Sequence, residues 1–170
     1  MAVKNQSELT NLLRQELKPV VDKVVDKIYK ENKDIVQQIV YDVYQPEIYQ
    51  RTYEFRDVAW ETTPAHNNGK LRIQGDMHFA PENMSYDADH WVHGSNYGGD
   101  VREALAEIIY QGKSGPMFGK GVWTRKRNAY NALIKRLGKR RFNSYLKEAL
   151  DECGIKYEAH ERAIDFTEIE

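Results

Sequence analysis

Polar side chains that could bind a metal ion are clustered near the middle of the chain, at Asp87, Asp89, His90 and His93. Carboxylates and neutral imidazoles are good ligands for zinc or manganese, and Asp76 and His78 stand a short way upstream. The surrounding segment, YDADHWVHGSNYGGD (86–100), is polar, aromatic and rich in glycine, which is typical of a surface loop. A loop does not align the two imidazoles as a helix would, so we expect ordinary loop residues here and no bound metal.

The glycine-rich segment GKSGPMFGKG (112–121) is a second candidate for chemistry, because glycine-rich loops can cradle phosphate groups. Its spacing is not that of the P-loop of nucleotide-binding proteins, and the sequence holds no GxSxG, GxGxxG or HExxH motif. Cys153 is the only cysteine, which excludes an internal disulfide and a zinc site made of several thiolates. We therefore expect no enzyme activity and no cofactor.

The distribution of charge is the stronger functional signal. Between Lys120 and Lys147 the chain holds ten Lys and Arg residues and no Asp or Glu, whereas Glu148–Glu170 holds eight carboxylates against two cations. A formal net charge of −1 for the whole chain hides this separation. Such segregation is typical of a protein that meets an oppositely charged surface, either nucleic acid or another copy of itself.

The basic stretch supplies the candidate contact residues for DNA or for acidic neighbours: Arg125, Lys126, Arg127, Lys139, Arg140 and Arg141. Trp123 and Tyr130 could stack on bases if their rings are exposed. The plainer alternative is a solvated basic face that pairs with the acidic C-terminal segment or with a neighbouring subunit.

Hydrophobic periodicity predicts the elements that must position these residues. Apolar side chains recur at helical spacing from Leu9 to Val43, with Pro19 inside, so we expect either one kinked helix or a break near residue 18. Segments 53–62 and 70–79 are strand-like and flank an Asn-Gly turn, which predicts an antiparallel pair. Helices are expected at 101–110 and from Tyr130 to Leu150, with a kink or break at Gly138.

This order predicts an α+β fold: a long N-terminal amphipathic helix, a small antiparallel sheet and C-terminal helices. We expect a single domain over residues 1–155 and an acidic C-terminal tail over 156–170, in which 163–169 could form a late strand. Tyrosines cluster where the first helix ends, and four residues there are candidates for subunit packing: Tyr44, Tyr49, Arg51 and Tyr53. A helix-to-sheet junction packed with aromatic rings is the alternative interpretation.

Three segments carry a family resemblance. YQRTYEFRDVAWE (49–61) is similar to a motif Y-x-R-T-G-x-L-R-x-S, with Tyr53 in place of the usual Gly and Phe55 in place of Leu. IIYQGKSG (108–115) resembles a tyrosine and Glu-x-Gly segment that precedes a loop, and TRKRNAYNALIKRL (124–137) resembles the start of a final helix. Over residues 9–155 this order resembles the neck or tail-completion proteins of tailed bacteriophages.

The resemblance implies a structural virion protein and not a catalyst. Copies would form a ring in the neck, between the portal-side connector and the tail, around the channel through which DNA passes. The implied partners are copies of itself, the connector and tail proteins, and packaged DNA held by backbone contacts; the implied location is the virion neck, after assembly in the host bacterial cytoplasm. No membrane contact is expected, since no stretch approaches the roughly 20 apolar residues of a membrane helix. The alternative function is a non-sequence-specific nucleic-acid-binding protein that uses residues 120–147.

Overall fold

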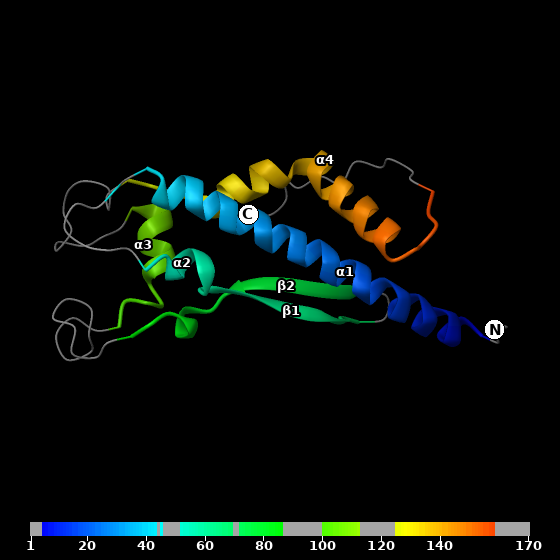
Figure 1. Cartoon of the computed structure of the whole chain (residues 1–170). Coiled ribbons are helices and arrows are strands. Elements are labelled where there is room, and N and C mark those ends of the chain that lie inside the picture. The colour runs from blue at the N-terminus through cyan, green and yellow to red at the C-terminus, as the bar shows by residue number, and fades with distance from the viewer. Residues whose placement is uncertain are drawn as a thin grey trace. The chain divides into compact units, whose positions relative to one another are not determined.

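The computed structural model describes residues 5–43, 45, 52–69, 72–86, 100–112 and 125–158, except the side chain of Lys139. The elements run in the order α1 (Gln6–Val36), the π-helical turn η1 (Gln37–Tyr41), α2 (Glu54–Asp57), β1 (Trp60–Asn67), β2 (Ile73–Phe79), the 3-10 turn η2 (Pro81–Asn83), α3 (Leu105–Gln111) and α4 (Ala129–Glu152) (Figure 1). This confirms the predicted α+β class, with a long N-terminal helix, a two-stranded antiparallel sheet and C-terminal helices.

Helix α1 is continuous through Pro19, so the prediction of a separate short helix ending near residue 18 is wrong. Proline removes one backbone donor, and the long apolar stripe on either side of it maintains the helix through packing. The helix then widens into η1, where the Asp42 amide donates to the Gln37 carbonyl at 2.9 Å. That five-residue spacing is the hydrogen-bond pattern of a π turn.

The chain divides into two compact units, each described here by itself. The first unit comprises Met1–Lys30, Thr62–Met77 and Ile134–Glu170, and the second comprises Glu31–Glu61 and His78–Leu133. Helices α1 and α4 and both strands each contribute residues to both units. The predicted limits of one domain over 1–155 and a tail over 156–170 stay a prediction, and residues 159–170, with the late strand, lie outside the described part.

In the first unit, α1 lies between the second half of α4 and the β-hairpin (Figure 1). Val20, Val24 and Ala149 are its buried centre, and partly buried side chains pack around them: Leu17, Ile28, Phe142, Leu146, Leu150, Cys153 and Ile155. The hairpin side is held by polar contacts as well. The Ala65 amide donates to Asp22 Oδ1 at 2.6 Å, and Arg14 Nη2 donates to the Gly69 carbonyl at 2.8 Å.

In the second unit, the core is a cluster of aromatic rings. Phe55, which is buried, packs edge-on against Trp60 and Tyr110, and the Trp60 and Tyr110 rings are stacked with centroids 6.5 Å apart. The Trp60 indole donates to the Phe55 carbonyl at 2.9 Å. Burial raises the pKa of the Tyr110 hydroxyl far above its usual range. Because Glu54–Asp57 forms α2 here, the first strand begins at Trp60 and not at residue 53 as predicted.

The predicted break in the last helix is confirmed at Gly138, whose backbone angles are φ 38° and ψ 177°. These angles are open to glycine and strained for residues with a Cβ. The two halves of α4 therefore take different directions at this residue.

Candidate assembly surface

The second half of α4 exposes a set of cations because its apolar positions are used by the core. Phe142, Leu146 and Ala149 face the first unit's core, so residues at the opposite helical positions face solvent. Arg140 and Lys147 are seven residues apart, two helical turns, and are both exposed. Together with the exposed Arg141, and with the exposed Lys135 in the half of α4 before Gly138, they form what we call the basic face, which is Lys135, Arg140, Arg141 and Lys147.

One member of the basic face is positioned by a neighbouring side chain. Arg141 Nε donates to the Tyr145 hydroxyl at 3.0 Å, and its guanidinium lies 6.0 Å from the centre of that ring. This one-turn contact reduces the rotamer freedom that Arg141 would lose on binding a partner. Arg140 is also exposed, and its contact with DNA or an acidic neighbour stays a prediction, whereas the side chain of Lys139 lies outside the described residues.

Two carboxylates of the same helix, Glu148 and Glu152, are held by lysines of α1. Lys23 Nζ lies 2.8 Å from Glu152, and Lys27 Nζ lies 3.0 Å from both Glu148 and Glu152. The hydrogen bond from Lys23, with that from Lys27, lowers the pKa of Glu152 to about 2, and the pKa of Glu148 is lowered chiefly by Lys27. Two acids that the sequence places at the start of an acidic segment are therefore paired inside the first unit, and the basic face keeps its positive charge.

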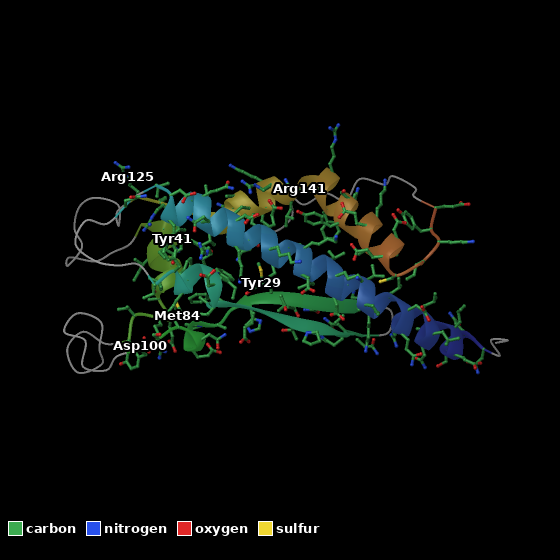
Figure 2. All side chains as sticks on the ribbon, viewed as in Figure 1. Tyr29, Tyr41, Met84, Asp100, Arg125 and Arg141 are labelled. Atoms are coloured by element: carbon green, nitrogen blue, oxygen red, sulfur yellow. The ribbon has the colours of Figure 1, made fainter. Side chains whose placement is uncertain are left out.

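Arg127 departs from the prediction that it contacts DNA or a neighbour, because the folded chain buries it. It is 8% exposed, and its Nη1 donates to the Val40 carbonyl at 3.3 Å. Its backbone amide donates to the Ile109 carbonyl at 3.1 Å. Arg127 therefore joins the segment before α4 to the rest of the second unit, while Arg125 and Lys126 beside it are exposed (Figure 2).

Of the four predicted packing residues, Tyr44, Tyr49 and Arg51 lie outside the described part of the chain. Tyr53 is described, and it is the residue with φ 60° just before α2. Its ring centre is 4.8 Å from that of Tyr41, and the Arg56 guanidinium lies 4.9 Å from it. The motif that this segment resembles has glycine at this position, and glycine adopts a left-handed backbone without strain. Tyr53 remains 37% exposed, so its subunit-packing role stays a prediction.

Residues 87–99 of the loop predicted over 86–100 lie outside the described residues, including the candidate metal ligands at 87, 89, 90 and 93. Within the described ranges, no group of three or more His, Cys, Asp or Glu side chains is placed to hold a metal ion. Asp76 accepts a hydrogen bond from Gln74, and His78 lies 3.8 Å from Glu61. Over the same ranges, no helix has the length and apolar character needed to cross a membrane.

Sequence reasoning missed the pairing between α1 and α4, although a signal for it was present. Lys23 and Lys27 are spaced by four residues, as are Glu148 and Glu152, so each pair lies on one side of its helix. Two such pairs on packed helices form a matched ladder of opposite charges. The composition of residues 148–170 does not reveal this pairing, because a count of acidic residues does not show which lysines elsewhere in the chain they contact.

Comparison with known proteins identifies the chain. The model of the YomN family matches residues 5–153, which is most of its length, while no curated protein and no solved structure gives a significant match. The chain belongs to the YomN family, and this family is phage-derived.

Proposed function

We propose that this member of the phage-derived YomN family is a structural protein of a tailed-phage virion. Its copies form a ring in the neck that joins the head connector to the tail around the DNA channel. The protein acts by assembly and not by catalysis, and it needs no cofactor. Its partners are other copies of the chain, the portal-side connector and tail proteins, and packaged DNA through backbone contacts. It is assembled in the host cytoplasm and resides in the virion neck.

The observation that carries this proposal is the basic face of α4. A neck ring needs surfaces that hold a neighbouring subunit or DNA phosphates without reading a base sequence. The exposed cations of Lys135, Arg140 and Lys147 suit both tasks, and Glu148 and Glu152 of the same helix are held by Lys23 and Lys27, while Asp151 is an exposed acid beside Lys147. The overall order of the elements also agrees with the resemblance to neck and tail-completion proteins.

The test is the phenotype of a phage from which the gene has been deleted. We expect DNA-filled heads and separate tails to accumulate in the lysate, with few joined particles in negative-stain electron microscopy. Complementation with the intact chain restores joining, whereas a variant Arg140→Glu/Lys147→Glu restores it poorly. Normal joined virions from the deletion phage would contradict the proposal.

A second function, non-specific nucleic-acid binding by the free protein, is favoured by one observation in the second unit. Tyr130 is 48% exposed in the first turn of α4, four residues along the chain from Lys126, and Arg125 and Lys126 are also exposed. Exposed aromatic rings beside cations can stack on unpaired bases. Fluorescence anisotropy with labelled single-stranded and duplex DNA tests this function. A Tyr130→Ala variant should weaken binding to single strands, whereas the control Tyr157→Ala, also an exposed tyrosine, should not. Equal binding by both variants would contradict a stacking role for Tyr130.

A further inference from the structure

The two compact units carry opposite charge. The described residues of the first unit hold thirteen Lys and Arg against nine Asp and Glu, which gives a net charge of +4. Those of the second unit hold six Lys and Arg against ten Asp and Glu, which gives −4. Sequence order did not reveal this polarity, because each unit is built from segments that are far apart along the chain.

The positive charge of the first unit is concentrated at the basic face. Arg140 and Lys147 are exposed on the side of α4 opposite its core positions, and Ser144 lies between them. Ser144 donates to Glu148, which Lys27 also holds, so this carboxylate is engaged on the flank of the helix. The outward side therefore presents Arg140 and Lys147, with Glu148 engaged on the flank and Asp151 as an exposed acid one turn after Lys147.

The negative charge of the second unit includes exposed carboxylates on neighbouring segments. Glu82 in η2 and Glu103 just before α3 are both exposed. Arg102 joins these two segments, since its Nη1 donates to the Met84 carbonyl at 2.8 Å and its Nη2 lies 2.8 Å from Asp100 (Figure 2). Arg102 neutralises Asp100, which leaves Glu82 and Glu103 as the outward acids of this surface.

We infer that the basic face of one copy docks on the Glu82 and Glu103 surface of the second unit of a second copy. This inference rests on the proposed function, which requires contacts between copies, and it names the partner of the basic face. Complementary charge steers association and fixes which surfaces meet. Because the two surfaces belong to different units, the contact is head-to-tail, and a bound pair keeps one unused basic face and one unused acidic surface for further copies.

The test uses the purified chain alone, in sedimentation velocity over a range of protein and salt concentrations. The intact chain should self-associate, and the association should weaken as salt rises, because salt screens exposed charges. Arg140→Glu/Lys147→Glu should raise the apparent Kd about tenfold or more, since each reversal turns an attraction into a repulsion. Lys30→Glu/Arg72→Glu changes net charge equally at exposed positions away from the basic face and should leave the Kd near that of the intact chain.

A complementation arm separates head-to-tail docking from other arrangements. Glu82→Lys/Glu103→Lys should also fail to self-associate, because it retains a basic face without an acidic partner. Mixing it with Arg140→Glu/Lys147→Glu should restore association with the two variants alternating, because their two intact surfaces attract one another and so do their two reversed surfaces. Combining all four substitutions in one chain should restore self-association.

Three results would overturn the inference: an intact chain that stays monomeric at all concentrations, reversals that leave its association unchanged, or a combined variant that stays monomeric. Far-UV circular dichroism of each variant confirms that it is folded before it is compared. A chain that is monomeric alone but required for joining heads to tails would refute this contact and leave the proposed function standing. A chain that self-associates as inferred but is dispensable for virions would refute the proposed function and leave the contact between copies standing.

Discussion

The sharpest prediction concerns Gly75, where β2 meets α1. A Cβ at this position would lie 2.9 Å from Val21 Cγ1 and 2.9 Å from Val25 Cγ2, closer than methyl groups can approach. An extra methyl group in a packed interface lowers the free energy of unfolding by about 1–3 kcal/mol. Replacing a glycine within a strand by alanine raises it by about 0.5–1 kcal/mol. Gly75→Ala should therefore lower the free energy of unfolding by up to about 2.5 kcal/mol, which corresponds to a Tm lower by up to about 10 °C in a chain of this size.

Urea unfolding followed by circular dichroism measures this change. Asp76→Ala is the matched control, because the next residue on a strand points to the opposite face. Val21→Ala in the Gly75→Ala background removes one clashing methyl group, so the two substitutions together should cost less than the sum of their separate effects. The sign decides the outcome: a Gly75→Ala variant more stable than the parent chain would show that α1 does not approach β2 this closely.

Three further predictions concern single contacts. The pKa of Glu152 is lowered from 4.5 to about 2, so the stability that this ionised carboxylate contributes is present above pH 4.5 and is lost as the pH falls towards 2. The variant Lys23→Met removes one of its two cations, so its stability should fall less steeply with pH in acid unfolding curves. Gly138→Ala should lower the free energy of unfolding by about 1–3 kcal/mol, because Cβ-bearing residues are strained at its backbone angles, and an unchanged urea midpoint would contradict this reasoning. Asp22→Ala should cost about 1–2 kcal/mol and speed hydrogen exchange at the Ala65 amide; exchange as slow as in the parent chain would show that this hydrogen bond is unimportant.

Much of the fold could be predicted from the sequence, because local signals dominate its long elements. Periodic apolar residues indicated α1, and a single glycine inside a helical stripe indicated the break at Gly138. The short α2 was missed, since four residues carry too little periodicity to separate a helical turn from a strand start. Tyr53 at φ 60° occupies the place of a motif glycine, and a tyrosine there gives no local sign of a left-handed backbone.

The candidate surface was predictable in part. The sequence indicated the exposed cations of α4, but not which basic residues the fold would bury. Arg127 was grouped with its neighbours by charge, whereas its guanidinium is enclosed beside the Val40 carbonyl. The pairing of Glu148 and Glu152 with α1 also depends on a contact over more than a hundred residues of sequence. Such long-range partners decide whether a charged segment presents its charge to solvent or uses it internally.

Quantitative mass spectrometry of purified virions tests the central claim most directly. The phage that encodes this chain would be purified through density gradients, and the chain would be counted against the major capsid and tail proteins. A structural role in the neck predicts a fixed, small number of copies per particle, retained through purification and enriched in the connector fraction of disrupted virions. Absence of the chain from intact particles, together with its presence in the infected cell, would contradict that role.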